Sequence, residues 1–183
     1  AIAKAFTGPA FSDDRDQADN AQRLVLVIED EVAFAKILFD LAHEMGYRCL
    51  EAHNSDEGLH LAEQYQPQAI LLDIRLPDQS GLSVLHELKQ HANTRHIPVH
   101  VVSGADHSEA ALHLGAIGYA LKPTTLDELK RVFGRLEEKL TQKIKRVLLV
   151  EDDERQRESV KELIADDDVE ITPVGLGAEA LEL

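Results

Sequence analysis

Three acidic residues stand where apolar runs of the sequence end. Glu29 and Asp30 directly follow the run at 24–28, and Asp73 directly follows the run at 68–72. Carboxylates that lie close together repel one another, and a hard divalent cation with oxygen ligands relieves that repulsion. We therefore expect Glu29, Asp30 and Asp73 to hold Mg²⁺, an ion that commonly shares its ligation with phosphate oxygens.

Two later apolar runs also end in chemically useful side chains. Ser103 follows the run at 99–102 and precedes Gly104, and its hydroxyl could donate to a phosphate oxygen. Lys122 follows Leu121, and its ammonium group could neutralise charge that the metal does not reach. An aspartate carboxylate can accept a phosphoryl group covalently, so this set of groups favours phosphoryl transfer.

A regular alternation of strand-like and helix-like segments must position these groups. We expect strands at 24–28, 47–52, 68–72, 99–102 and 119–121, and helices at 32–45, 55–65, 80–91, 108–114 and from 126 onward. This order favours an α/β domain whose parallel sheet is covered by helices on both faces. Ligands of such sheets bind beyond the carboxyl ends of the strands. The acidic residues therefore meet if the first and third strands are neighbours.

The helix that begins at Leu126 is expected to be long. Thr124 or Thr125 can form a capping box with the acidic residue three positions later. An apolar stripe then continues to about residue 145 without a Gly- or Pro-rich break, further than one sheet requires. Residues 141–145 are therefore expected to form a helical connector. The part of helix 126–145 that is not needed to cover its own sheet is expected to form an interdomain spacer or a homodimer contact.

A repeated pattern indicates a second copy of the same fold. Residues 146–153 (RVLLVEDD) repeat the pattern of residues 23–30 (RLVLVIED), so that Asp30 recurs as Asp152 after 122 residues. A helix, a strand and the start of another helix follow in the same order. Two strands cannot make a complete parallel sheet. We expect residues 146–183 to be part of a second domain, with Glu151 and Asp152 as an incomplete acidic site.

Five motifs, in order, resemble those of the response-regulator receiver domain of two-component signalling. They are Glu29-Asp30, then Asp73, then Leu76-Pro77 with Ser80-Gly81, then Ser103-Gly104, and finally Tyr119-Ala120-Leu121-Lys122-Pro123. The resemblance covers residues 23–140, with a partial second receiver at 146–183. It implies a flavodoxin-like (βα)5 doubly wound parallel sheet with strand order 2-1-3-4-5.

The resemblance also implies a metal site. Asp73 would be the phosphoacceptor, and Glu29, Asp30 and Asp73 would hold Mg²⁺ together with the backbone carbonyl of Arg75. Glu29 stands where the family more often has Asp, and its extra methylene could shift the metal. Arg75, two residues after the acceptor, borders the site and could alter the rate of dephosphorylation.

The same resemblance implies roles or geometry for four further residues. Ser103 and Lys122 would contact the phosphoryl group. Tyr119 would be the aromatic switch residue, which turns inward when Ser103 moves toward the phosphate. The peptide bond before Pro123 would be cis.

The function implied by the resemblance is that of a phosphoacceptor module. A histidine kinase or a histidine phosphotransfer protein would supply the phosphoryl group, and the parent protein would be a hybrid sensor histidine kinase or a multi-receiver regulator. One alternative is a receiver used without phosphorylation, for docking or dimerisation. Another is a flavodoxin-like cofactor binder. The sequence disfavours it because no Ser/Thr/Gly-rich phosphate loop follows the first strand, and Glu29, Asp30 and Glu31 in that place would repel the phosphate of a cofactor.

Composition excludes several other classes. The chain has 183 residues, 44% of them apolar, and carries a formal charge of −15 from 34 acidic and 19 basic residues. Such a charge disfavours direct contact with nucleic acid or an anionic membrane. Cys49 alone cannot form an internal disulfide bond, and no apolar run is long enough to span a bilayer. We expect a cytoplasmic module behind a linker at 1–22, although the parent protein could be membrane-bound.

Overall fold

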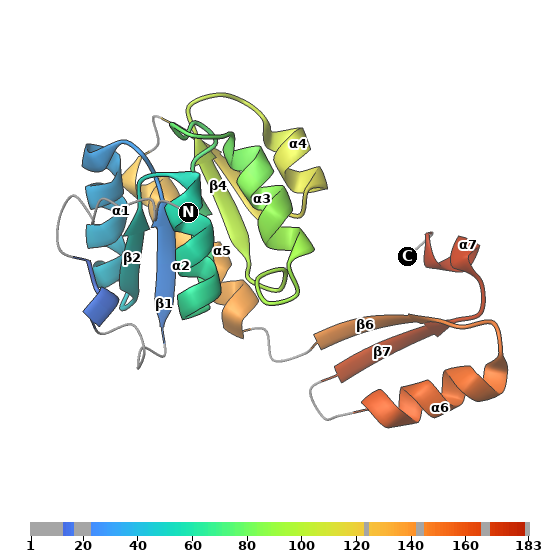
Figure 1. The fold of residues 1–183 in the computed structure, drawn as a ribbon. Coiled ribbons are helices and arrows are strands. Elements are labelled where there is room, and N and C mark those ends of the chain that lie inside the picture. Colours follow the sequence, from blue (N-terminus) through green and yellow to red (C-terminus); the bar gives the residue numbers. More distant parts are fainter. Residues whose placement is uncertain (1–12, 17–22, 123–124, 142–144, 166–168, 182–183) are drawn as a thin grey trace, which may run out of the picture. The chain divides into compact units, whose positions relative to one another are not determined.

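The computed structural model describes residues 13–16, 23–122, 125–141, 145–165 and 169–181. Contacts between residues divide the chain into two compact units, Ala1–Leu140 and Thr141–Leu183. Figure 1 shows the helices and strands of both units. Among the described residues, no helix has both the length and the apolar character needed to cross a membrane.

The first unit is built on a five-stranded parallel sheet in the order β2-β1-β3-β4-β5. Its strands are β1 (Leu24–Ile28), β2 (Arg48–Ala52), β3 (Ala69–Leu72), β4 (Val99–Ser103) and β5 (Gly118–Leu121). Its helices are α1 (Val32–Glu44), α2 (Ser55–Tyr65), α3 (Gly81–Gln90), α4 (Ser108–His113) and α5 (Leu126–Thr141). The expected flavodoxin-like fold and its strand order are confirmed.

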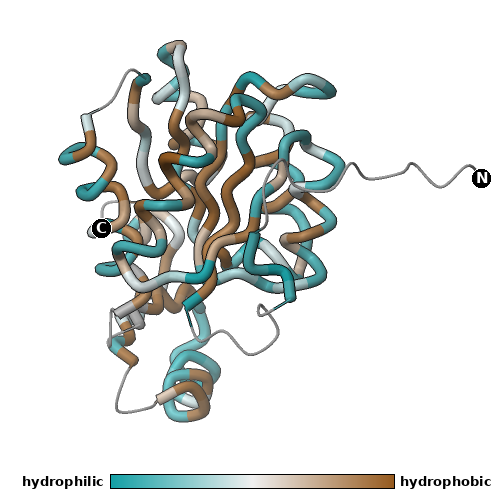
Figure 2. Tube along the Cα trace, turned by 90° about the vertical axis from the view of Figure 1, so that its left-hand side faces the viewer, coloured by the Kyte–Doolittle hydropathy of each residue, from teal (hydrophilic) through white to brown (hydrophobic). Residues whose placement is uncertain are grey.

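Helices cover both faces of this sheet. Buried residues of α1 and α5 pack on one face, and those of α2, α3 and α4 pack on the other. Every residue of β1, β3 and β4 is buried, which is why β1 and β3 read as continuous apolar runs. The apolar residues accordingly concentrate in the central strands (Figure 2). The strands that lead to the acidic residues, and the strand that ends at Ser103, are therefore fixed by burial on both sides.

Local signals at two helix starts agree with the sequence. The side chain of Asn54 accepts a hydrogen bond from the backbone N–H of Glu57 and so caps α2. Thr125 and Glu128 form the expected capping box, since each side chain bonds the other's backbone N–H at 3.2 and 2.9 Å.

Part of the segment expected to be a linker is packed against the sheet. The backbone N–H of Asp14 donates to the carbonyl of Cys49 in β2 at 3.1 Å, and Asp14 is buried. The carboxylates of Asp13 and Asp14 accept hydrogen bonds from the edge of β2, which gives these two residues a structural role that composition does not reveal. Residues 1–12 and 17–22 lie outside the described residues.

The second unit contains a two-stranded parallel sheet of β6 (Lys145–Val150) and β7 (Val169–Val174). The helices α6 (Glu154–Ile164) and α7 (Gly177–Ala180) follow these strands. Paired residues lie 24 positions apart in the β6–β7 ladder, as they do in the β1–β2 ladder. The two ladders therefore have the same separation in sequence between paired residues.

The structure corrects the expected length of the helix from 126. We predicted a helix through residue 145, with 141–145 as a helical connector, but α5 ends at Thr141 and Lys145 is the first residue of β6. The physical reason is that Lys145 joins the ladder by pairing with Val169, so the apolar run that follows is extended rather than helical. The apolar stripe of α5 is correspondingly shorter.

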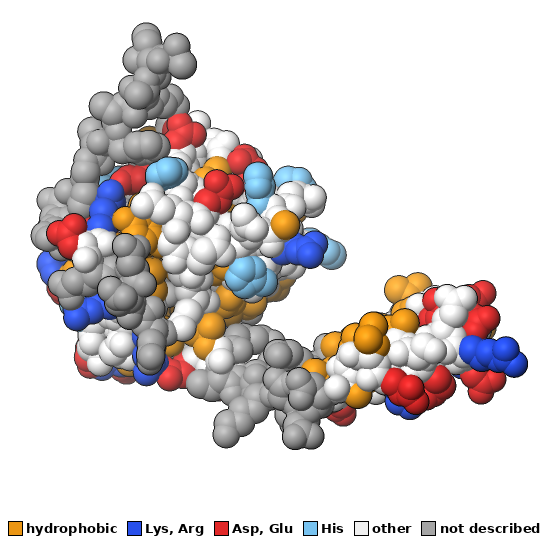
Figure 3. All heavy atoms as spheres, turned by 60° about the horizontal axis from the view of Figure 1, so that its bottom comes forward, with side chains coloured by type: hydrophobic (Ala, Val, Ile, Leu, Met, Phe, Trp, Pro, Cys, Tyr) orange, Lys and Arg blue, Asp and Glu red, His pale blue; other side chains and the backbone are white. Residues whose placement is uncertain are grey.

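The second unit has no core of its own in the described part. None of its described residues is buried, and large apolar side chains lie at its surface (Figure 3). The most exposed are Leu148, Val150, Val160, Leu163, Leu176 and Leu181. The described part of the second unit thus repeats the order of strands and helices that begins the first unit, but it lacks the buried core that stabilises the first unit.

Candidate functional site

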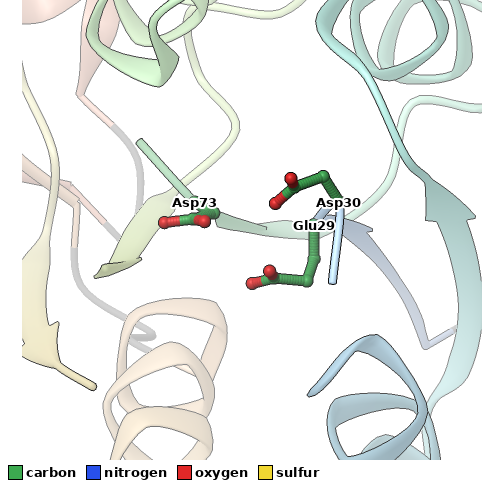
Figure 4. Close-up of side chains that lie close together, drawn as sticks. All are labelled: Glu29, Asp30 and Asp73. Carbon is green, nitrogen blue, oxygen red and sulfur yellow. The ribbon is translucent and has the colours of Figure 1, made fainter. Parts of the chain in front are cut away.

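The acidic residues meet because β1 and β3 are neighbours in register. Ile28 pairs with Leu72, and the backbone N–H of Asp73 donates to the carbonyl of Ile28 at 2.9 Å. One carboxylate oxygen from each of Glu29, Asp30 and Asp73 lies within 4.8 Å of the others (Figure 4). Glu29 and Asp73 are buried, whereas Asp30 is exposed, so the cluster opens to solvent on one side.

Lys122 brings the end of β5 to the same place. Its Nζ lies 2.5 Å from Oε2 of Glu29 and 3.2 Å from Oδ2 of Asp73, and 4.4 Å from the centre of the Phe34 ring. The backbone N–H of Lys122 donates to the carbonyl of Ser103 at 2.8 Å, which joins the ends of β4 and β5. Two buried carboxylates and one ammonium group therefore share a single pocket.

The pKa of the Glu29 carboxyl lies well above the usual value for a glutamate. Burial raises the pKa of the Glu29 carboxyl to about 7, and the hydrogen bond and charge of Lys122 act against this rise. The negative charge of Asp73 adds to the rise, and the backbone N–H of Glu31 opposes it. A carboxylate in such surroundings is stabilised by any further positive charge.

The donor set fits Mg²⁺. A pocket of about 290 Å³ is lined by Glu29, Asp30, Glu31, Asp73, Arg75 and Lys122. It supplies carboxylate oxygens and no sulfur or imidazole ligand, which is the preference of a hard cation that keeps part of its water shell. Glu31 was not among the residues expected to border the site, and its signal in the sequence is the unbroken acidic run 29–31.

The loop after Asp73 is fixed from both ends. A side chain at Gly81 would overlap the backbone carbonyl of Asp73, so glycine is required where α3 begins beside Asp73. The Asp78 carboxylate accepts hydrogen bonds from the backbone N–H groups of Ser55 and Asp56 and from the Ser55 hydroxyl. Although burial acts to raise it, the pKa of Asp78 is lowered to about 2 by these bonds. The anchoring role of Asp78 was not predicted from the sequence.

Ser103 and Tyr119 lie on the neighbouring strands β4 and β5. Ser103 is buried, and its hydroxyl has no hydrogen-bond partner among the described residues. The Tyr119 hydroxyl donates to the carbonyl of Ala105 and accepts from the backbone N–H of His107. Ser103 thus offers an uncommitted donor at the end of β4, where its backbone carbonyl already binds the N–H of Lys122. Pro123 lies outside the described residues.

Arg75 packs over the end of β4. A Cβ at position 104 would lie 2.5 Å from Nη2 of Arg75, so the absence of a side chain at Gly104 leaves room for the guanidinium group. The Arg75 side chain therefore lies against Gly104, directly after β4, and also lines the pocket. Its backbone carbonyl as a metal ligand remains a prediction.

The second unit repeats the acidic loop but not the site. The backbone N–H of Glu151 donates to the carbonyl of Val174, as that of Glu29 does to Ala52. Oε1 of Glu151 accepts from the N–H of Asp153 at 3.1 Å, as Oε1 of Glu29 does from Glu31 at 3.2 Å. Among the described residues, a group of three possible metal ligands occurs only at Glu29, Asp30 and Asp73.

Comparison with known proteins identifies the family. The model of the response regulator receiver domain matches residues 25–133, and the chain belongs to this family. The chain is 40% identical over 79 residues to the polar-differentiation response regulator DivK of Brucella anthropi, covering 43% of this chain and 64% of DivK. It is 30% identical over 112 residues to the regulatory protein AtoC of Escherichia coli, covering 61% of this chain and 24% of AtoC. The chain therefore spans less than two thirds of either relative.

Solved structures give the same fold. A CheY-like receiver domain protein from Methanospirillum hungatei superposes with a TM-score of 0.58 at 26% identity, covering 63% of this chain and 94% of that chain. The receiver domain of the sensor histidine kinase PA1611 from Pseudomonas aeruginosa, described with a magnesium ion in its active-site cleft, gives a TM-score of 0.57 at 26% identity. That match covers 62% of this chain and 96% of the other. Both neighbours are matched over nearly their whole length.

Proposed function

We propose that the chain is a phosphoacceptor module that takes a phosphoryl group from a partner phosphohistidine onto Asp73 with the help of Mg²⁺. The observation that carries this proposal is the position of Lys122, whose ammonium group lies between the carboxylates of Glu29 and Asp73 at the open end of the sheet. The pocket is lined by four carboxylates and two cationic side chains, so its negative charge is not fully balanced. The site therefore favours one more cation and the phosphate group that such a cation accompanies.

The chemistry follows from the orientation of the Asp73 carboxylate. Its Oδ1 accepts the backbone N–H of Ile74 at 2.7 Å, and its Oδ2 faces Lys122 at 3.2 Å. One carboxylate oxygen attacks the phosphorus atom, the P–N bond to the partner histidine breaks, and its electron pair stays on the imidazole. The product on Asp73 is an acyl phosphate, which water later hydrolyses to carboxylate and inorganic phosphate.

The other residues of the site stabilise the transferred group. Bound Mg²⁺ would supply the positive charge that neutralises phosphate oxygens next to Asp73, held by Glu29, Asp30 and Asp73. Lys122 neutralises further charge, and the uncommitted hydroxyl of Ser103 donates to a phosphate oxygen. Movement of Ser103 toward the phosphate would release space for Tyr119 to turn inward, which is the expected switch.

Intact mass measurement tests the phosphoacceptor role. The full chain is incubated with Mg²⁺ and acetyl phosphate, and one phosphoryl adduct is expected. The adduct should be absent after Asp73→Asn and unchanged after Asp152→Asn, the matched control in the second unit. An adduct that survives Asp73→Asn would contradict the proposal. No adduct on the unsubstituted chain would favour the alternative of a docking scaffold.

The repeated pattern supports a second receiver in the parent protein. Residues 146–183 have the same strand separation and the same acidic loop as the first unit, with Glu151 and Asp152 in the positions of Glu29 and Asp30. We propose that the parent is a hybrid sensor histidine kinase or a multi-receiver regulator acting in the cytoplasm. A histidine kinase or a histidine phosphotransfer protein would be the partner.

A homodimer through the helix at 126–145 stays a prediction. The helix α5 that remains is Leu126–Thr141, so the surface available for this contact is smaller than expected. Light scattering across a range of concentrations distinguishes the outcomes, because a monomeric mass at high concentration would exclude the dimer.

A further inference from the structure

The edge strand β2 is closed by a short segment that precedes the sheet. β2 is an edge strand with β1 as its neighbour, so the outward N–H and C=O groups of Cys49 and Glu51 need other partners. Residues 13–15, here called the clasp, supply all four. The carboxylates of Asp14 and Asp13 accept from the N–H groups of Cys49 and Glu51 at 2.8 and 3.0 Å. The backbone N–H of Asp14 and Nη2 of Arg15 donate to the two carbonyls at 3.1 and 2.8 Å.

Arg15 is the central charge of the clasp. Its Nε lies 2.9 Å from Oδ2 of Asp13, and its Nη2 lies 2.9 Å from Oε1 of Glu57 on α2. Both carboxylate side chains are 2% exposed, so each depends on the guanidinium group for compensation of its charge. The Glu51 carboxyl beside them is buried, and burial together with the charge of Asp13 raises its pKa to about 8. Burial therefore favours the neutral, protonated form of Glu51.

A chain of hydrogen bonds connects the clasp to the acidic site. Oε2 of Glu57 accepts from the backbone N–H of His53 at 3.3 Å. Nδ1 of His53 lies 2.8 Å from the backbone carbonyl of Glu29, to which it donates in the tautomer that carries its proton on Nδ1. The N–H of Glu29 in turn donates to the carbonyl of Ala52, directly before His53. The peptide between Glu29 and Asp30 is thus held from the side of β2.

We propose that Arg15 is a positioning residue for the metal site, acting through Glu57 and His53 on the peptide that carries the carboxylates of Glu29 and Asp30. This inference rests on the proposed Mg²⁺ site. Residues that orient metal ligands change metal affinity when they are removed, even though they do not touch the metal. The clasp precedes the family match at 25–133, so this positioning contact comes from outside the matched residues.

Mg²⁺ affinity of the full chain, measured by calorimetry, tests the proposal. Arg15→Ala should raise the dissociation constant for Mg²⁺ about three- to tenfold, less than the loss typical of a residue that bonds a ligand side chain directly. Arg15→Lys should restore part of the affinity. Arg23→Ala is the matched control, because Arg23 also pairs with a carboxylate, that of Glu137, but on an exposed surface of the unit. It should leave the dissociation constant unchanged.

A second variant separates positioning from folding. His53→Ala breaks the last link while the clasp stays closed, so Mg²⁺ affinity should fall and the amide protons of Cys49 and Glu51 should stay protected from exchange. In Arg15→Ala those two amide protons should exchange faster. Combining the two substitutions should weaken binding by less than the product of their separate effects, since both act through one chain of contacts.

The outcomes distinguish this inference from the proposed function. Unchanged Mg²⁺ affinity in Arg15→Ala and His53→Ala, or an equal loss in Arg23→Ala, would overturn the positioning role and leave the phosphoacceptor role intact. Absence of Mg²⁺ binding by the unsubstituted chain would overturn both. Normal Mg²⁺ binding and its loss in Arg15→Ala, without phosphorylation of Asp73, would support the positioning role and reject phosphoryl transfer.

Discussion

The two acidic loops of this chain have nearly the same local structure and different surroundings. In each, the backbone N–H of a glutamate donates to the carbonyl of the last residue of the neighbouring strand, β2 or β7. The carboxylate of the same glutamate accepts a hydrogen bond from the backbone N–H two residues later. Around the first loop, β3 and β5 supply Asp73 and Lys122. Around the second, β7 pairs on one side of β6, and the described residues add no third ligand.

Burial differs as sharply as the ligand set. All five residues of β1 are buried, whereas Leu148 and Val150 of β6 are 47% and 45% exposed. Short-range sequence is therefore sufficient to shape the loop, because its hydrogen bonds join residues close in sequence or in the adjacent strand. The site requires residues from distant strands, and those strands are held in place by the core.

Substitution of equivalent leucines should give the largest contrast between the units. Leu26 and Leu148 occupy the same place in the repeat, but Leu26 is fully buried and Leu148 is 47% exposed. Leu26→Ala should lower the free energy of unfolding of the first unit by about 2–5 kcal/mol, because it leaves a cavity in a packed core. Leu148→Ala should change the stability of either unit by less than about 1 kcal/mol. Amide hydrogen exchange in β1 and β6 measures both, and equal losses would show that β6 is buried in solution.

Acid should destabilise the first unit through His100. Burial lowers the pKa of His100 to about 4, helped by the charge of Arg135 and opposed by a hydrogen bond to Val101. In the unfolded chain the pKa is near 6.5, so the unfolded state binds more protons between these values. Stability is therefore lost as the pH falls from about 6.5 to 4, by roughly 2–3 kcal/mol in total.

The variant His100→Leu isolates this contribution. Other groups titrate in the same range, and the raised pKa of Glu51 acts in the opposite direction, because its stabilising effect is lost as the pH rises toward 8. The difference in unfolding free energy between the unsubstituted chain and His100→Leu should shrink or reverse as the pH falls below 6.5. A difference that is constant from pH 7 to pH 4 would contradict the assignment. Urea denaturation at several pH values provides the measurement.

The strands and the acidic residues of the first unit could be predicted from the sequence wherever the apolar pattern is periodic or the motif is continuous. Buried strands such as β1 and β3 read as apolar runs, and their ends correctly located Glu29, Asp30 and Asp73. Residues whose role depends on contacts distant in sequence were missed, including Asp78, which anchors the loop to α2, and Arg15, which reaches Glu57. The end of α5 was also missed, since the ladder with β7 competes with helical propensity at Lys145.

Magnesium should stabilise the first unit and leave the second unchanged. A ligand at ten times its dissociation constant stabilises the folded state by about 1.4 kcal/mol if it does not bind the unfolded chain. Amide exchange in β1 should slow correspondingly, whereas exchange in β6 should not change. Asp30→Asn should reduce the effect and Asp152→Asn should not. Protection of both sheets by Mg²⁺ would show that Glu151 and Asp152 also hold the metal.

Among these substitutions, Ser103→Ala should change the free energy of unfolding of the unphosphorylated chain least, and the sign of that change is informative. The buried hydroxyl has no hydrogen-bond partner among the described residues, so its removal breaks no bond there and relieves the desolvation of one polar group. We expect the first unit to be unchanged or stabilised by less than about 1 kcal/mol. The same substitution should shorten the lifetime of the Asp73 phosphate or slow its formation, because a donor to the phosphate oxygen is lost. Marked destabilisation without phosphorylation would mean that Ser103 has a structural partner, and its hydroxyl would then not be held in reserve for the phosphoryl group.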